Sequence, residues 1–422
     1  MNAPDRSTFD RINSTLEAGR AERRKTAFDT FEAAAMPTQK LENWKYVDID
    51  FDLKDIAVAE DAGDPIDPGP FLENLGAREA TITIVDGRVT SVVGGENVGI
   101  VRLSEADAET AAIADDLISP TRDAFAAARS AFGTDGVIVT APRNANIEAP
   151  VVIDVQSTSE SGSYPSISVV AEENSEIPVI VMLRGTQGVA SVLSPQIGLH
   201  AGSGARIRYV AVQNLSFEST GVIHQKIEIG RDATVKMGEV GLGGKIGRLD
   251  LDVELQGQGS SAEVVGVYFG EYQQTLDYRM IIHHIGKNTS SDVFLKGAVE
   301  DEAQSVFTGL LKIDKGAERS SAFETNRNLV LSDGAKAHSV PNLEIECDDV
   351  VCGHGSSVGP LEDSHLYYLQ SRGLSPERAE RLMIKGFFNE MIERLPVAGL
   401  AEPVRDELFG RFITAQSEGR VA

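Results

Sequence analysis

Five short segments recur along the middle of the chain: SEI at 175–177, ARI at 205–207, ATV at 233–235, AEV at 262–264 and SDV at 291–293. Each ends in a β-branched residue, and these residues, at positions 177, 207, 235, 264 and 293, follow one another at steps of 30, 28, 29 and 29. A repeat of this length built from strand and turn residues indicates a solenoid or a propeller. Propeller blades repeat nearer about 40–45 residues and the chain has 1 Trp, so the spacing favours a β-solenoid.

The repeat lies within a longer zone, from residue 136 to about residue 350, where β-branched runs alternate with turns rich in Gly, Asn, Asp and Ser. Within it, LDLDVEL at 249–255 alternates apolar and acidic residues, as expected for a strand with one face in a core. We expect Asp250, Asp252 and Glu254 to lie on a solvated outer face. Alternate strand residues are about 6.6 Å apart, which also suits the carboxylate pair of a β-helix polysaccharide lyase or hydrolase.

Helical patterns flank this zone on both sides. Residues 7–35 and the Ala-rich residues 104–132 have helical spacing, and a further helix is expected over 361–373, ending at a glycine. Ser375 followed by Pro376 is a typical helix start. The apolar face of that last helix is predicted from Ala379, Leu382, Met383, Gly386 and Phe387. The chain is therefore expected to be mainly β, with a mostly helical N-terminal domain (1–135), a solenoid core (136–360) and a C-terminal helical domain (361–422).

The composition limits the classes of partner. Asp and Glu number 64 against 39 Lys and Arg, a formal net charge of −25, which argues against nucleic acid and against anionic membrane surfaces. Two cysteines in 422 residues fit a reducing compartment rather than a disulfide framework. The N-terminal segment has no apolar signal core, and no run approaches the roughly 18 apolar residues of a membrane span. These features predict a cytoplasmic protein.

The sequence CGHG at 352–355 holds the strongest candidate for chemistry. Cys352 and His354 are two residues apart in an extended segment, so both side chains point to the same face, and thiolate and imidazole bind iron and zinc well. Two ligands cannot complete a tetrahedral site, so a second chain or further residues must supply the others. His283 and His284 are consecutive in a strand pattern and point to opposite faces, which favours structural or solvent-facing roles.

Several motifs around these residues resemble one family, the SufB/SufD scaffold proteins of iron–sulfur cluster assembly. The matching segments are PNLEI at 341–345, DDV at 348–350, CGHG at 352–355, YL at 368–369 and SRG at 371–373. Weaker matches are ENWKY at 42–46 and the set His284, Thr289, Ser290 or Ser291, Lys296 and Gly297. The length and Gly355, where the SufB branch has glutamate, make the chain most similar to the SufD branch.

This resemblance implies a right-handed parallel β-helix between helical end domains, acting as a non-catalytic subunit of a SufBCD complex. It implies pairing with a SufB-like subunit, or with a second copy, near Cys352 and His354, which would serve nascent cluster assembly and iron acquisition. It also implies docking of a SufC-like ABC-type ATPase on the C-terminal helices. No cofactor is expected to bind tightly to the isolated chain; iron or a cluster would be transient. A SufB-like, cluster-carrying subunit is the alternative within the family.

No ATP hydrolysis is expected from this chain itself. The segment GEVGLGGKI at 238–246 looks like a phosphate loop, but a phosphate loop needs glycine at position 239 and serine or threonine at position 246. The chain has Glu239 and Ile246 there. Any dependence on ATP must therefore come from a partner.

Overall fold

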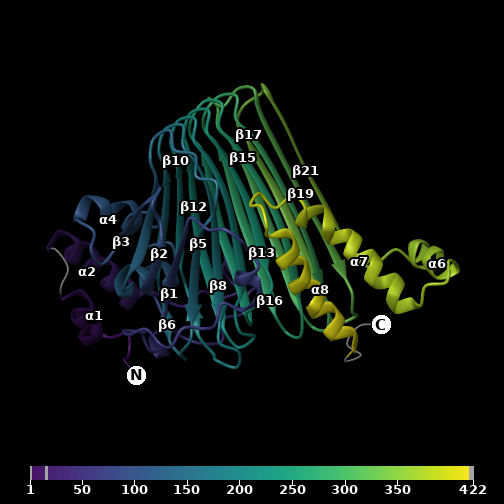
Figure 1. The fold of residues 1–422 in the computed structure, drawn as a ribbon, viewed down its shortest axis with the longest axis horizontal. Helices are drawn as coiled ribbons and strands as arrows, with labels where there is room; N and C mark the ends of the chain where they lie inside the picture. Colours follow the sequence, from purple (N-terminus) through teal and green to yellow (C-terminus); the bar gives the residue numbers. More distant parts are fainter. Residues whose placement is uncertain (1, 15–17, 418–422) are drawn as a thin grey trace.

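The protein is described by a computed structural model over residues 2–14 and 18–417, with 41% strand against 22% helix. Two large sheets of mostly parallel strands face each other and form a β-solenoid of about 8 turns (Figure 1). Helices lie at both ends of the chain. The predicted mainly β solenoid with N- and C-terminal helices is confirmed. Residues 1, 15–17 and 418–422 of the two predicted end domains lie outside the described residues.

Each turn of the solenoid contributes one strand to each sheet. The 10-stranded sheet has the order β2 (Arg88–Gly94), β1 (Ala80–Val85), β5 (Val151–Ser157), β8 (Glu176–Gly185), β11 (Arg206–Asn214), β13 (Thr234–Gly241), β15 (Ser261–Gly270), β17 (Ser290–Val299), β19 (Ser320–Val330) and β21 (Val350–Gly359). The 11-stranded sheet has the order β20 (Lys336–Ile345), β18 (Gln304–Ile313), β16 (Thr275–His284), β14 (Ile246–Leu255), β12 (Thr220–Ile229), β10 (Gln196–Ala201), β7 (Ser166–Ala171), β4 (Gly136–Ala141) and β3 (Gly99–Arg102). The short strands β6 (Gly162–Ser163) and β9 (Val192–Leu193) pair beside it.

The inward faces of both sheets form one continuous apolar core, because apolar residues of each turn stack on apolar residues of the turn before it. The repeat places Ile177, Ile207 and Val235 side by side on β8, β11 and β13, as its spacing predicts. At β15 the register differs: Val235 pairs with Ala262, while Val264 pairs with Met237. A displacement of two residues keeps Val264 on the inward face. The predicted fold therefore remains correct although the predicted alignment of this turn is not.

Helices of the N-terminal part cover the first turns of the solenoid. They are α1 (Arg6–Asn13), α2 (Ala18–Ala33), α3 (Gly69–Glu73), α4 (Ala108–Asp115) and α5 (Ala124–Phe132), with single turns at Glu42–Trp44 and Leu53–Asp55. Phe125 and Phe132 of α5 are fully buried and pack with Val222 of β12 and Ile246 of β14. The hairpin of β1 and β2 pairs antiparallel and closes that end of the 10-stranded sheet.

The C-terminal helices α7 (Pro376–Ile392) and α8 (Ala401–Ser417) lie along the outer face of the 10-stranded sheet, and α6 (Asp363–Ser371) extends beyond β21 (Figure 1). The Ser375 hydroxyl accepts a hydrogen bond from the Arg378 amide, so the predicted helix start is confirmed. The predicted apolar face of α7 is wrong in part. The buried residues are Ala379, Ile384, Phe388, Met391 and Ile392, whereas Leu382 is 50% exposed. No helix within the described ranges is long and apolar enough to cross a bilayer.

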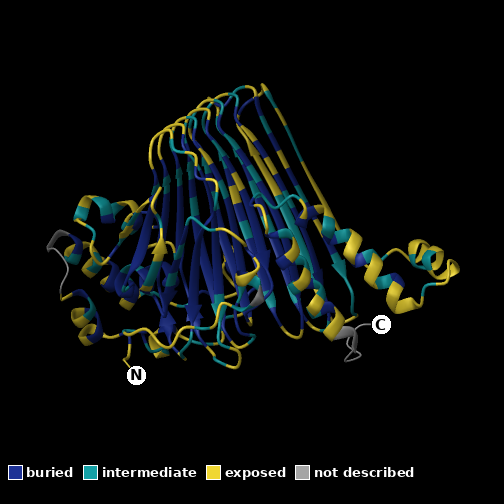
Figure 2. Ribbon diagram, viewed as in Figure 1, coloured by how far each residue is buried: buried dark blue, intermediate teal, exposed yellow. Residues whose placement is uncertain are grey.

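The solenoid ends in β20 and β21, the last strands of their sheets. We call residues 336–359, which hold these two strands and their connection, the terminal coil. Its residues are mostly half-buried or exposed, in contrast with the buried strands before it (Figure 2). Leu343 and Val358 continue columns that are buried one turn earlier, yet they are 38% and 46% exposed. Nothing in the described chain stacks on this coil in the way each coil stacks on the one before it.

Candidate functional site

Cys352 and His354 lie on β21, in the terminal coil. Cys352 is the register partner of Ala322 on β19, and His354 is the register partner of Glu324. Ala322 and Glu324 are both buried, while Phe323 between them is 44% exposed. This alternation places Cys352 and His354 on the inward face, as the spacing predicts. Their role in metal or cluster chemistry stays a prediction.

The two side chains differ in burial. Cys352 is half-buried and packs against the main core, whereas His354 is exposed. Both cysteines of the chain, Cys347 and Cys352, are free thiols. Because no further coil covers the inward face here, a ligand or a second chain can reach both groups from the open end of the solenoid.

The weaker family match that begins at His284 has an explanation in the contacts of its residues. His284 points inward and is fully buried; its Nδ1 lies 2.7 Å from Thr289 Oγ1 and its Nε2 lies 2.8 Å from Ser291 Oγ. Burial, aided by the neighbouring His283, lowers the pKa of His284 to about 4, so the ring is neutral at pH 7. His283 points outward to Asp314 at 2.9 Å. The prediction that these consecutive histidines point to opposite faces, with structural or solvent-facing roles, agrees with this geometry.

Lys296, from the same motif, anchors a C-terminal helix. Lys296 is 4% exposed, and its Nζ donates to the Phe387 carbonyl at 2.9 Å and to Glu390 Oε2 at 2.5 Å. The adjacent Gly297 has no Cβ because the Tyr268 ring occupies that space. The motif therefore positions α7 on the sheet and makes room for a ring inside the solenoid.

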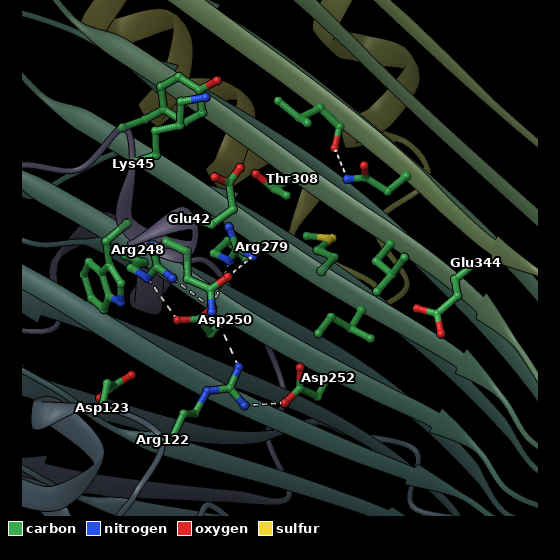
Figure 3. Close-up of a pocket in the computed structure, with 18 of the residues that line it drawn as sticks. Glu42, Lys45, Arg122, Asp123, Arg248, Asp250, Asp252, Arg279, Thr308 and Glu344 are labelled. Carbon is green, nitrogen blue, oxygen red and sulfur yellow. Dashed lines mark hydrogen bonds and ion pairs between the residues drawn. The ribbon is translucent and has the colours of Figure 1, made fainter. Parts of the chain in front are cut away.

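The ENWKY segment docks on the outer face of the 11-stranded sheet. Trp44 is buried, and the guanidinium of Arg248 lies 3.8 Å from its ring centroid. Arg248 also donates to the Asn43 carbonyl at 2.9 Å and pairs with Asp250 and Asp277. Burial raises the pKa of Asp277 to about 6, despite the Arg248 charge. Figure 3 shows Arg248, Arg122 and Arg279 gathered around Asp250 in a groove of about 590 Å³.

The expectation of a solvated outer face is therefore wrong for Asp250, which is 5% exposed. The N-terminal segment and α5 cover it, and its carboxylate is used by Arg248, Arg122 and Arg279. Arg122 also pairs with Asp252. A glycosidic acid–base pair needs carboxylates that face a substrate. Asp250 instead faces arginines, which removes the geometric support for a polysaccharide enzyme on this strand.

Beside this groove, Asp123, His224 and Asp250 bring three possible metal-ligand atoms within 4.8 Å of one another. His224 is fully buried; its Nε2 lies 2.9 Å from Asp123 Oδ2 and its Nδ1 lies 3.0 Å from Arg129 Nη1. A guanidinium only donates, so Nδ1 accepts and Nε2 donates to Asp123. Burial opposes ionisation of Asp123, but its interactions with His224 and the Ala126 amide hold its pKa below the usual range. Every ligand atom is already used, and the surrounding arginines oppose a cation.

Sequence reasoning missed the carboxylates inside the solenoid. Glu239 and Glu324 are 4% and 1% exposed, and burial raises the pKa of each to about 8. The burial of Glu324 follows from the alternation in SSAFETNRNLV at 320–330, where alternate residues from 320 to 328 are buried although all of them except Ala322 are polar. The two-residue period of this strand could have placed the row that holds Glu324 on the inward face. The polarity of the row suggests a solvent-facing position instead, which is wrong.

Comparison with known proteins identifies the family of the chain. The family described as "SUF system FeS cluster assembly, SufBD core domain" matches residues 154–387. An iron–sulfur cluster assembly SufBD family protein of Mycobacterium tuberculosis is 34% identical over 292 residues, covering 67% of this chain and 72% of the relative. The SufD proteins of Bacillus subtilis and Escherichia coli are 31% and 27% identical over 282 and 235 residues, covering 65% and 55% of this chain and 63% and 55% of the relatives. This chain belongs to the SufBD family of iron–sulfur cluster assembly proteins.

Proposed function

We propose that this protein is a SufD-like, non-catalytic scaffold subunit of a SufBCD-type complex. In this role it pairs with a SufB-like subunit, or with a second copy of itself when alone, through the terminal coil. Cys352 and His354 then contribute to nascent cluster assembly at that junction, with iron or a cluster as transient cargo. The C-terminal domain, residues 361–422, docks a SufC-like ABC-type ATPase. The observation that carries the proposal is the open terminal coil with Cys352 and His354 on its inward face.

The surface of the terminal coil suits a partner that continues the solenoid. Leu343, Ile345 and Val358 are 38%, 39% and 46% exposed, and Val351 is 63% exposed. The edge strands β20 and β21 also present unpaired backbone groups, which bind another strand readily. A second solenoid end placed here would bury these side chains and bring its own ligands towards Cys352 and His354.

The C-terminal helices offer a separate surface for the ATPase. The described part of α6 has no buried residue, and Tyr367 and Tyr368 are 76% and 55% exposed. Leu382 on α7 adds a third exposed apolar side chain. Exposed aromatic residues that cluster at one end of a molecule are typical of protein interfaces, and they favour this end as the docking site.

The test of the cluster site uses the alanine variants of Cys352 and His354 in the co-expressed complex. His354 is exposed, so His354→Ala is expected to change the stability of the subunit by less than about 0.5 kcal/mol while cluster assembly in the cell falls. Thermal midpoint and assembly are measured for both variants. Full assembly activity in the double variant, or a large drop in the midpoint for His354→Ala, would contradict the proposal.

The test of the docking site is removal of residues 361–417. We expect the ATPase to stop co-purifying while circular dichroism retains the β signal of the solenoid. The Ile384→Ala variant, which changes a buried residue of α7, is the control for a loosened but present helix. Co-purification at the wild-type yield after the deletion would place the ATPase elsewhere.

A further inference from the structure

Glu324 is the exception in its row of inward side chains. On the same strand, Asn326 and Asn328 bind each other and the Tyr268 hydroxyl, with distances of 2.5–3.1 Å. Glu324 is 1% exposed, and neither carboxyl oxygen has a hydrogen-bond partner. A buried carboxyl without a partner is costly to the folded state. The fold keeps it one turn beneath the open end of the solenoid.

The chain also makes room for this carboxyl. Gly309 lies on β18 in the opposite sheet, and a Cβ at that position would collide with the carboxyl group of Glu324. The Glu324 side chain therefore reaches across the interior. The register partner of Glu324 on the terminal coil is His354, and Cys352 lies two residues before His354 on the same face of β21.

Strand geometry brings the three residues within reach of one ion. Neighbouring strands are about 4.8 Å apart and alternate residues along a strand about 6.6 Å apart. A cation above Glu324 at the open end is thus within side-chain reach of a thiolate, an imidazole and a carboxylate. In the described chain three ligand atoms come within 4.8 Å of one another only at Asp123, His224 and Asp250. The side chains of Cys352, His354 and Glu324 must therefore change rotamer to bind one ion together. His354 is exposed and Glu324 has no hydrogen bond to break.

We infer that Glu324 is a third protein ligand, with Cys352 and His354, for a divalent metal ion of the iron–zinc class at the open end of the solenoid. The inference rests on the proposed role of Cys352 and His354 and adds a residue to it. Sulfur, nitrogen and oxygen donors together suit these borderline ions, and three protein ligands leave a position for sulfide or for a partner's ligand.

The charges balance in this arrangement. In the empty site the Glu324 carboxyl is buried without a hydrogen-bond partner, an environment that favours the neutral acid. Binding of M²⁺ forms metal–sulfur and metal–oxygen bonds and releases the thiol and carboxyl protons to solvent, with no change in oxidation state. The loaded site then carries two negative ligands against a charge of +2, so no net charge is added to the interior.

The inference is tested with Co²⁺ added anaerobically to the purified chain, because cobalt bound to a thiolate has a near-ultraviolet charge-transfer band. We expect one Co²⁺ per chain. Cys352→Ser should lose the band, and Glu324→Gln should keep the band but weaken Kd at least tenfold. Glu239→Gln is the matched control, since it changes another buried acid of the same interior, and its Kd should equal that of the wild type.

X-ray absorption of the cobalt-loaded wild type gives a second measurement that does not depend on how variants fold; one sulfur and at least two nitrogen or oxygen neighbours are expected. A Glu324→Gln variant that binds Co²⁺ as tightly as the wild type, or a wild type that binds none, would overturn the inference. Either result would leave the proposed function standing if the Cys352 and His354 variants still impair cluster assembly in the complex.

Discussion

The buried acids inside the solenoid should make the protein less stable as the pH rises through neutrality. Glu239 and Glu324 hold their protons in the folded state up to a pKa of about 8, whereas an unfolded glutamic acid has a pKa near about 4.3. Between these values the folded state binds more protons than the unfolded state. The free energy of unfolding therefore falls as pH rises through this window and levels off above about pH 8.

The magnitude follows from proton linkage. Each group contributes about 1.36 kcal/mol per pH unit within the window, so the two together give roughly 2.7 kcal/mol per pH unit. An unfolding entropy of about 2.1 cal/mol/K per residue over 422 residues converts this to roughly 3 °C of Tm per pH unit. Changing Glu239 to glutamine, which resembles the protonated acid in shape, should remove about half of the slope.

The assay is Tm at closely spaced pH values from about 6.7 to 7.7. Two other buried groups with shifted pKa values titrate below this range: Asp277 at about 6 and His284 at about 4. The surface variant Glu96→Gln, at an exposed position, should retain the wild-type slope. Equal slopes for the wild type and Glu239→Gln would refute the reasoning, because they would mean that Glu239 does not hold its proton in the folded state.

Two further substitutions test the contacts that hold the end domains on the solenoid. Arg248→Met should lower the free energy of unfolding by about 3–5 kcal/mol, because it leaves Asp277 buried without its ion-pair partner and removes one of the three arginines around Asp250. Adding Asp277→Asn should recover part of the loss, and an unchanged Tm would show that the arginine is dispensable. Lys296→Met should cost roughly 1–3 kcal/mol and speed hydrogen exchange in α7, because the bonds to Phe387 and Glu390 are lost. Glu390→Gln, at a residue whose side chain is 51% exposed, should have a smaller effect, and unaltered exchange in Lys296→Met would contradict the anchor.

The solenoid could be predicted because the length of a repeat can be recognised even when individual turns are aligned with small errors. A two-residue displacement at β15 leaves Val264 inward, so the period identifies the fold even where it misaligns a turn. The same reasoning placed Cys352 and His354 on one face, since strand alternation is local.

The features that were missed depend on contacts between distant segments. Asp250 looks solvated in LDLDVEL, but Trp44 and its neighbours, some 200 residues earlier in the sequence, dock beside it, and Arg122 and Asp123, more than 100 residues earlier, lie against it. The face of α7 was misassigned because apolar residues occur on two sides of that helix, and packing against the sheet selects the one with Ile384 and Phe388. Glu324 was missed because burial of a polar row depends on Gly309 in the opposite sheet.

The uncovered terminal coil also affects how the chain folds. In a stack of coils each turn is stabilised by its two neighbours, and the last turn has one. Opening should therefore begin at β21 and proceed inward, so that amide exchange slows progressively from β21 towards β11. Anything that binds the open end adds the missing neighbour, and the gain grows with its free concentration as RT ln(1 + [L]/Kd). The folding equilibrium of this end of the molecule would thus report the free concentration of any molecule that binds there.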